Sequence, residues 1–345
     1  MADSDTTAPK GFLAELRDAV STRAALLVIG VFVIELAFIV SYLGAFHSPA
    51  PHRIPVAVVA PAPVRGQVVG RLNALPGDPV RARTATDRAE ARRLILRRTV
   101  DAAVVINPSG TTDTLLVASA GGPSVAQTAG QIAQDVERAN GRTVRVTDIR
   151  PPHRADGRGL SSFYLVIGLI VGGYVASSAL AMSHGARPAN VHRTTIRLGS
   201  LALLSTASGL GGAIIVDPVF GALPGHFGAL WGIGALTTFT AAAVGMALQV
   251  LFGQLGVGLA LLVFVVLGNP SAGGVYPSSL LPPFWSAIGQ ALPTGAATTL
   301  VRNTVYFNGN GTALAWWVLA AWAAGGLLVS YAASVRGRRA LGAAA

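Results

Sequence analysis

Six stretches of the chain are apolar enough to be candidate membrane-spanning helices. A helix needs about 20 apolar residues to cross the roughly 30 Å hydrocarbon core of a bilayer. The stretches are residues 24–46, 160–182, 198–216, 227–250, 253–268 and 313–334. The third is rich in Gly and Ser, and the fifth is short. The first exceeds the roughly 7–15 apolar residues of a signal-peptide core, so we expect it to be retained as a signal anchor.

This pattern predicts an α-helical polytopic membrane protein with six transmembrane helices, five of them in a domain at 160–335. Residues 47–159, between the first and second stretches, predict an inserted small α/β domain. Short alternating or buried strand patterns cover 54–60, 80–84, 101–107, 114–119 and 143–149, and helix patterns cover 64–75, 87–98 and 124–139. Asp87, with Glu90 three residues later, resembles a helix N-terminal capping box. The segment is long enough to bury a core of its own.

Two amphipathic segments complete the pattern. Residues 9–23 place Phe12, Leu13, Leu16 and Val20 on one helix face, which predicts an entry helix within 1–23 that lies in the cytoplasmic membrane interface. Residues 269–312 are too polar and too rich in proline to span the bilayer, although they carry several large apolar side chains. We interpret them as an outer, re-entrant region, which is possible where protein covers the broken helices.

Composition supports a membrane location and excludes several classes of protein. Hydrophobic residues make up 52% of the chain and charged residues 12%, about half the 25% that is usual in soluble domains. With no cysteine, the chain has no disulfides and no thiolate metal ligands. Its one lysine, Lys10, is not preceded by a glycine-rich loop, so the chain has no Walker A motif. No hydrolase motif is present either. We therefore expect no enzyme activity and no cofactor in this chain, and ATP, if used, on a partner subunit.

Basic residues in the short loops predict the orientation, because such residues favour the cytoplasmic side. They gather in three segments: the N-terminus with Lys10, Arg17 and Arg23, residues 183–197 with Arg187, Arg193 and Arg197, and the C-terminus with Arg336, Arg338 and Arg339. Residues 217–226 have none, and 269–312 have only Arg302. We predict a multi-pass plasma-membrane protein with both termini cytoplasmic, a tail at 336–345, and an extracytoplasmic domain at 47–159.

Few residues predict chemistry. Glu35 lies near the middle of the first stretch, where an ionisable group is costly and a role in a translocation path is the default hypothesis. An internal hydrogen bond to another helix is the alternative. Asp217 ends the third stretch and is either part of the same path or a solvated boundary residue. Arginines at 88, 92, 93, 97 and 98 form either a solvated helix face or a site for an anionic head group or polymer; nucleic acid is not expected outside the membrane.

Several segments resemble a known family of permeases. They are IPVAVVA at 54–60, the helix pattern at 87–98, VDAAVVIN at 100–107, and the turns at Pro270–Gly274, Leu281–Phe284 and Leu292–Gly295 before Arg302 and Tyr306–Phe307. Together they resemble the membrane subunits of type-2 ABC exporters, and most of all the phage-infection-protein-like branch. The resemblance implies a homodimer or heterodimer of permeases with a cytoplasmic ABC ATPase and with membrane lipids as further partners. It would move a lipid-like or amphipathic molecule through a wide apolar cavity lined by the first, second and fifth spans.

The resemblance also implies roles for residues. The ATPase coupling loop would contain Arg187, His192, Arg193 and Arg197. The outer gate would contain Pro270, Gly273, Gly274, Pro282, Phe284, Pro293 and Arg302. Two other readings remain open. One is a membrane-anchored protein that binds or organises the cell envelope through its extracytoplasmic domain. The other is a proton-coupled transporter, which an inverted repeat would favour.

Overall fold

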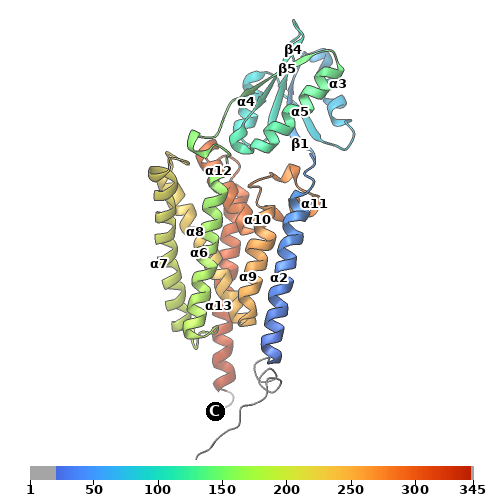
Figure 1. Ribbon diagram of the computed structural model, residues 1–345. Helices are drawn as coiled ribbons and strands as arrows, with labels where there is room; N and C mark the ends of the chain where they lie inside the picture. Colours follow the sequence, from blue (N-terminus) through green and yellow to red (C-terminus); the bar gives the residue numbers. More distant parts are fainter. Residues whose placement is uncertain (1–20, 343–345) are drawn as a thin grey trace, which may run out of the picture.

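The computed structural model describes residues 21–342, except for the side chains of residue 23 and of residues 336–342. Almost all of the predicted entry helix within 1–23 lies outside this part, as do the side chains of the predicted tail. The described chain forms a bundle of long helices with a small α/β domain at one end (Figure 1). Below, the end of the bundle next to this domain is called the sheet end, and the other is called the far end.

The α/β domain has five strands in the order β2-β1-β3-β4-β5. The strands are β1 (Ile54–Val59), β2 (Val80–Thr84), β3 (Ala102–Val105), β4 (Thr112–Val117) and β5 (Thr143–Asp148). Only β3 and β4 pair antiparallel; the other neighbours are parallel. The helices are α3 (Ala62–Asn73), α4 (Arg88–Leu96) and α5 (Pro123–Ala139). Every predicted strand and helix of this segment is therefore confirmed, with small shifts at the ends.

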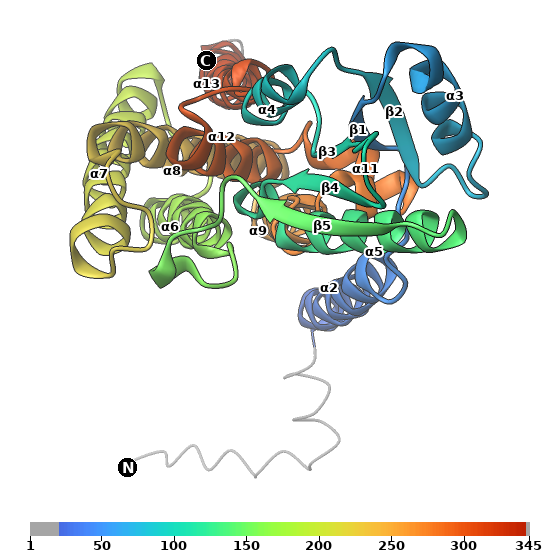
Figure 2. The same ribbon diagram turned by 90° about the horizontal axis from the view of Figure 1, so that it is seen from above.

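The two faces of the sheet are covered unequally. Alternate residues of β1 point to opposite faces: Ile54 and Val56 pack with residues of α5, while Ala57 packs with residues of α4. Helices α3 and α5 lie on one face and α4 on the other (Figure 2). The predicted N-cap of α4 is confirmed, since the Asp87 carboxylate accepts a hydrogen bond from the Glu90 N–H at 2.7 Å.

Five described helices are long and apolar enough to cross a membrane. They are α2 (Thr22–Phe46), α6 (Ser161–His184), α7 (Val191–Ile214, continued by the π-helix η3, Ile215–Val219), α8 (Phe227–Phe252) and α13 (Ala313–Gly342). The segment predicted as a sixth span at 253–268 instead forms a shorter apolar helix over Leu255–Ser271. It begins directly after α8, at a turn where Gly253 has a φ of +63°. Its length is below that of the five long helices, so the sixth span is not confirmed.

Helix α8 is the centre of the bundle and packs against α6, α7 and α13. Small residues allow these helices to approach closely, as is usual in membranes. At Gly209 of α7, a Cβ atom would lie 2.4 Å from the backbone nitrogen of Ala235 on α8. A buried polar contact adds to the packing: Gln249 of α8 donates to the Ser178 hydroxyl of α6 at 2.9 Å.

Helix α2 lies at the edge of the bundle beside the short helix, which consists of α9 (Leu255–Leu261), the π-helix η4 (Leu262–Leu267) and α10 (Gly268–Ser271) (Figure 1). Most of its residues are exposed; Ser41 and Ala45 are buried. Pro270 has no N–H to donate to the Val266 carbonyl four residues earlier, and the Ser41 hydroxyl donates to that carbonyl instead. Pro270 thus leaves the Val266 carbonyl of the short helix free to accept the hydrogen bond that holds α2.

Candidate functional site

The predicted outer gate forms a compact structure at the sheet end of the bundle. After α10 the chain makes the 3-10 turn η5 (Ser278–Leu280), the short helix α11 (Pro283–Gly289) and α12 (Pro293–Phe307). Pro283 and Pro293 each occupy the first helical position, where a missing N–H costs nothing, and Pro282 is the N-cap of α11. The Phe284 side chain of α11 is 56% exposed, so it does not take part in the buried core of this region.

Arg302 connects α12 to the turn that follows α10. Its side chain is 6% exposed. One guanidinium nitrogen, Nη1, donates to the Gly273 carbonyl at 2.8 Å, and Nη2 donates to the Gly274 carbonyl at 3.3 Å. Gly273 has a φ of +73°, and a Cβ atom at Gly274 would lie 2.4 Å from the Phe163 ring of α6. The structure therefore brings Gly273, Gly274 and Arg302 together, directly after the buried Pro270.

Helices α10, α11 and α12 touch backbone to backbone. A Cβ atom at Gly289 would lie 2.0 Å from the Ser271 carbonyl oxygen, and one at Gly295 would lie 2.0 Å from the Gly289 carbonyl oxygen. Thr294 adds a hydrogen bond from its hydroxyl to the Phe264 carbonyl at 3.3 Å. The turn, α11 and α12 therefore form one packed unit, with no space for larger side chains at the two glycines.

A second polar connection was not predicted from the sequence. The Tyr306 hydroxyl of α12 donates to the Asp156 carboxylate at 2.7 Å, and Asp156 is 3% exposed. The same carboxylate accepts a hydrogen bond from the Ser161 N–H at the start of α6, at 2.9 Å. The Tyr306 ring also lies 5.4 Å from the His153 ring. In the sequence, the only indication of a role for Asp156 is its position shortly before an apolar helix, which is typical of a capping residue.

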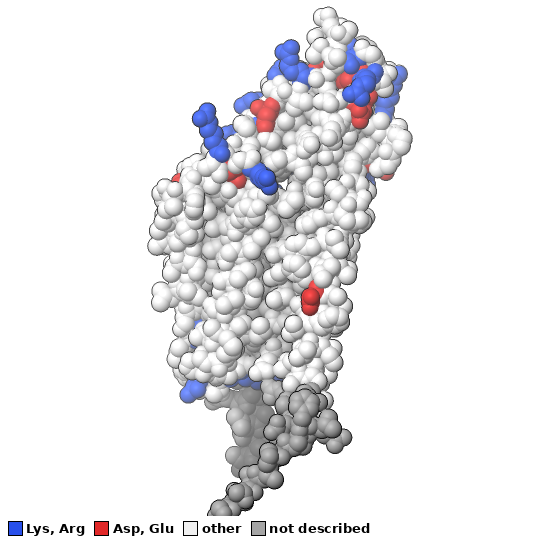
Figure 3. Space-filling model, viewed as in Figure 1, with Lys and Arg blue, Asp and Glu red and all other residues white. Residues whose placement is uncertain are grey.

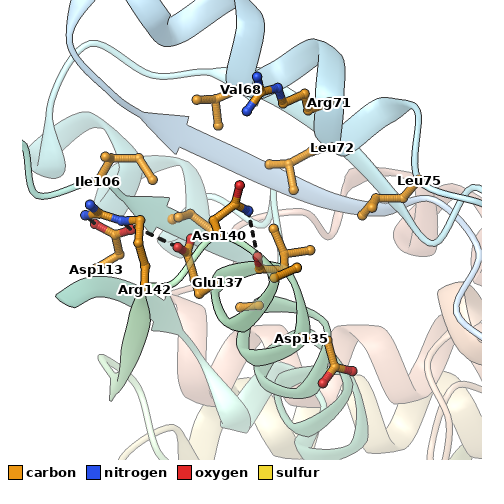
Figure 4. A pocket seen from close by; sticks show the side chains of 14 residues that line it. Val68, Arg71, Leu72, Leu75, Ile106, Asp113, Asp135, Glu137, Asn140 and Arg142 are labelled. Carbon is orange, nitrogen blue, oxygen red and sulfur yellow. Dashed lines mark hydrogen bonds and ion pairs between the residues drawn. The ribbon is translucent and has the colours of Figure 1, made fainter. Parts of the chain in front are cut away.

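The α/β domain contains an apolar groove between α3 and α5, which we call the α3–α5 groove (Figure 4). Its volume is about 560 Å³, within the usual size range of ligand pockets. The apolar lining residues are Val68, Leu72, Leu75, Val104, Ile106, Ala133, Val136 and Ala139, and the polar ones are Arg71, Asp113, Asp135, Glu137, Asn140 and Arg142. The groove exists because α3 and α5 do not meet over the middle strand, β3.

Three charged side chains close one end of the groove (Figure 4). Asp113 is completely buried and accepts two hydrogen bonds from Arg142, from Nε at 2.7 Å and from Nη2 at 2.6 Å. It also accepts the Asn107 N–H at 2.6 Å. The Glu137 side chain, 9% exposed, lies with one oxygen 3.6 Å from the Arg142 Nε. One arginine thus faces two carboxyl groups.

The two carboxyl groups respond in opposite ways. Burial raises the pKa of Asp113, but the hydrogen bonds from Arg142 and Asn107 outweigh burial and hold its pKa below the ordinary 3.8. Burial and the neighbouring Asp113 charge raise the pKa of Glu137 from the ordinary 4.5 to about 7. A carboxyl group with a shifted pKa inside a ligand-sized groove marks a candidate binding site.

The raised pKa predicts how stability depends on pH. The folded protein holds the Glu137 proton more tightly than the unfolded chain, so the free energy of unfolding falls as the pH rises from about 4.5 to about 7. We expect Glu137→Gln to remove this pH dependence and to stabilise the protein at pH 8. The measurement is thermal unfolding of the full chain in detergent at pH 5 and pH 8. Asp135→Asn, on the same helix with a side chain 74% exposed, is the control; an unchanged pH dependence in Glu137→Gln would contradict the assignment.

The predicted coupling loop lies at the far end, between α6 and α7. Arg187 donates from Nε to the Val250 carbonyl in the last turn of α8 at 2.9 Å. Arg197 donates to the His184 and Gly185 carbonyls at the end of α6, each at 2.9 Å. These two arginines therefore satisfy helix C-terminal carbonyls and hold the loop in place. In the described structure the exposed side chains of His192 and Arg193 have no hydrogen bond or ion pair.

Glu35 and Asp217, the two predicted path residues, lie apart. Glu35 is exposed on α2, on the outside of the bundle, and Asp217 lies half-buried in η3 at the sheet end of α7. The structure does not bring either of them into a common cavity with the other. Among residues 21–342, no three His, Asp or Glu side chains are grouped so that they could hold a metal ion.

These features define a polytopic helical membrane protein with a small α/β domain at one end. The family model described as ABC-2 family transporter protein matches residues 23–332, nearly the whole chain. The chain belongs to this family, whose members are membrane components of ABC transporters and normally work with a cytoplasmic ATPase. The narrower resemblance to the phage-infection-protein-like branch stays a prediction. The comparisons with curated proteins and with solved structures give no match.

Proposed function

We propose that this permease is the membrane subunit of an exporter that moves a lipid-like or amphipathic small molecule across the plasma membrane, with ATP hydrolysed on a separate cytoplasmic chain. The observation that carries the proposal is the family match, which covers the helix bundle and the α/β domain together. A homodimer or heterodimer of permeases would complete the transporter. The outer wall of α2, which the bundle leaves exposed, is available for such a partner or for lipid.

The proposed orientation places the sheet end outside the cell and the far end in the cytoplasm. Helix α2 begins at the far end, and α13 runs toward it (Figure 1). Charged side chains gather at the sheet end and at the far end, while the wall between them is nearly uncharged (Figure 3). The arginines of the α6–α7 loop lie at the far end, in agreement with the preference of basic loops for the cytoplasm.

The grooves of the protein favour an amphipathic substrate. The α3–α5 groove has apolar walls and a charged end, which suits a molecule with an apolar body and a polar head. A second groove of about 660 Å³ lies between α6 and α7 at the level of the bundle, with walls formed largely by glycines and apolar side chains. A purely polar solute would find few hydrogen-bond partners in it.

The proposed contact with the ATPase uses His192 and Arg193, at the exposed N-terminal turn of α7. Since Arg187 and Arg197 hold the loop itself, their replacement would disturb the fold as well as the contact. We expect His192→Glu/Arg193→Glu to abolish co-purification of a stoichiometric ATPase from the native cell in mild detergent, as read by mass spectrometry. A partner surface that is complementary to a basic patch carries negative charge, so glutamates at these two positions would repel it.

The control is Arg81→Glu/Arg83→Glu, two exposed arginines on β2 of the α/β domain, which should leave the ATPase bound. Loss of the ATPase in both variants would indicate a general charge effect and would contradict the proposed contact. Capture of an envelope protein or polymer without any ATPase, abolished by deleting residues 54–149, would instead establish the envelope-binding alternative.

A further inference from the structure

A small cavity lies where the α/β domain meets the bundle, and we call it the junction pocket. Its volume is about 250 Å³. Three segments that are far apart in the sequence line it: α4, the chain after β5, and the loop between α12 and α13. The lining residues are Arg93, Leu96, Arg97, Arg150, Phe307, Asn308 and Asn310.

The junction pocket is strongly basic. Three of its seven lining residues are arginines, and none is acidic. The ion pairs of the described residues include none of Arg93, Arg97 and Arg150. Two carboxylates lie nearby and both have other partners. Glu90, one turn before Arg93, accepts the Thr86 N–H and hydroxyl, each at 2.6 Å. Asp148 accepts the backbone N–H of Arg150 at 3.0 Å and the Ser119 hydroxyl. In the described structure the lining of the pocket therefore carries positive charge, and no carboxylate forms an ion pair with its three arginines.

Arg150 carries a buried donor without an acceptor. Its Nε atom is buried and has no hydrogen-bond partner in the described structure. A buried N–H that loses its hydration costs about 1–3 kcal/mol when nothing accepts it, so a bound ligand that supplies an acceptor would be favourable here. The neighbouring Arg98 shows the contrast: it pairs with Asp101 at 3.1 Å and lies over the Phe307 ring at 4.7 Å. That contact also fixes one wall of the pocket.

The pocket lies close to the expected level of lipid head groups. Trp316 and Trp317 are in the first two turns of α13, just after the loop that lines the pocket, and they are 43% and 75% exposed. Exposed tryptophans on a membrane bundle mark the interface between water and hydrocarbon. Guanidinium groups match phosphate oxygens with paired, charge-assisted hydrogen bonds, and the Asn308 and Asn310 side chains could supply further donors.

We propose that the junction pocket is a binding site for a phosphate group, bound by Arg93, Arg97 and Arg150. The phosphate belongs either to the head group of a membrane lipid or to a soluble phosphate compound. Asn308 and Asn310 of the α12–α13 loop line the same pocket, so a phosphate bound there would lie between the α/β domain and that loop. The proposal does not depend on the substrate or the ATPase of the exporter.

The test uses the full chain, purified and delipidated in detergent. Phosphatidylglycerol, diacylglycerol and inorganic phosphate are added separately, and binding is read by native mass spectrometry for the lipids and by calorimetry for phosphate. We expect phosphatidylglycerol to bind, diacylglycerol not to bind, and Arg93→Gln/Arg97→Gln to weaken binding by about tenfold for each arginine removed. Arg150→Gln should weaken it by a similar factor.

The matched control is Arg88→Gln/Arg92→Gln, which removes the same charge from exposed positions of the same helix that do not line the pocket. It should keep the affinity within about twofold, since these side chains do not line the pocket and solvent and salt screen their charges. Circular dichroism and thermal unfolding establish that each variant is folded. Binding of phosphatidylglycerol alone identifies a lipid head group, and binding of inorganic phosphate as well identifies a site open to soluble phosphates.

Two results would overturn the proposal. One is an equal loss of binding in the pocket variant and in the control variant, which would show unspecific attraction to a basic surface. The other is undiminished binding in folded Arg93→Gln/Arg97→Gln and Arg150→Gln proteins. Either result would leave the proposed exporter function untouched, because co-purification of the ATPase is measured at the far end of the bundle.

Discussion

Arg302→Met is expected to lower the free energy of unfolding by about 3 kcal/mol. The guanidinium satisfies the carbonyls of Gly273 and Gly274 in a buried site, and methionine fills similar space but donates nothing. Each buried carbonyl left without a donor costs about 1–3 kcal/mol. The measurement is the shift in thermal unfolding of the full chain in detergent, followed by tryptophan fluorescence.

Arg302→Lys is the conservative variant, and we expect an intermediate loss, because one ammonium group cannot reach both carbonyls with the planar geometry of arginine. Arg138→Met is the control, since the Arg138 side chain is 76% exposed; it should have almost no effect. If Arg302→Met were as stable as the original protein, the cost of burying the charge would equal the gain from its hydrogen bonds, and the turn would need another source of stability.

Gly289→Ala and Gly295→Ala are each expected to destabilise the protein by about 1–3 kcal/mol, the usual cost of overpacking. The new methyl carbon would lie 2.0 Å from the Ser271 carbonyl oxygen in one variant and 2.0 Å from the Gly289 carbonyl oxygen in the other. Since both contacts are to backbone, relief requires α10, α11 and α12 to separate. Thermal unfolding and resistance to limited proteolysis between residues 272 and 293 are the measurements.

Gly325→Ala is the matched control, because this glycine also lies in a helix but has no atom within 4 Å of the position of a Cβ. Alanine is the better helix former, so this variant should be neutral or slightly stabilising. Equal stability of Gly289→Ala and Gly325→Ala would show that α11 is not packed against α10 as described.

The elements of the α/β domain could be predicted from the sequence because its signals are local. Strand alternation, the glycine and proline turns and the Asp87 cap each act within a few residues. The α3–α5 groove could not be predicted, because it depends on how far α3 and α5 stand apart over β3. Nor could the Asp113–Arg142 pair, whose members lie 29 residues apart and meet only because β4 and β5 are neighbours.

The long helices of the bundle follow from their apolar length, whereas the short helix at 255–271 shows the limit of that signal. Its apolar pattern resembles that of a span, but the helix is bounded by turns at Gly253 and Gly273. Apolar length alone therefore does not show whether a helix of this size crosses the membrane. The contact between Tyr306 and Asp156 spans 150 residues of chain. Such a pair cannot be recognised without the fold, although each residue alone has an ordinary capping or interface role.

The predicted basic loop shows why residue type alone does not define a role. Arg187, Arg193 and Arg197 are equivalent in a count of positive charges. In the structure, two of them satisfy helix carbonyls and one remains exposed without a partner in the described part of the chain. A charge count therefore predicts an orientation for the loop, but it does not separate the arginines that hold the loop from the one that can meet another protein.

The loose attachment of α2 has a consequence for the biogenesis of the protein. Helix α2 precedes the other described spans in the chain, and it can enter the bilayer before they are made, because its backbone hydrogen bonds are internal to the helix. Its hydroxyl contact from Ser41 to Val266, however, joins residues 225 positions apart. In the proposed orientation, the α/β domain must be translocated and α6, α7 and α8 inserted before that contact can form. Among the described spans, α2 is thus synthesised first and docked late. Its insertion and its docking are separate steps, and a different assembly factor could act on each.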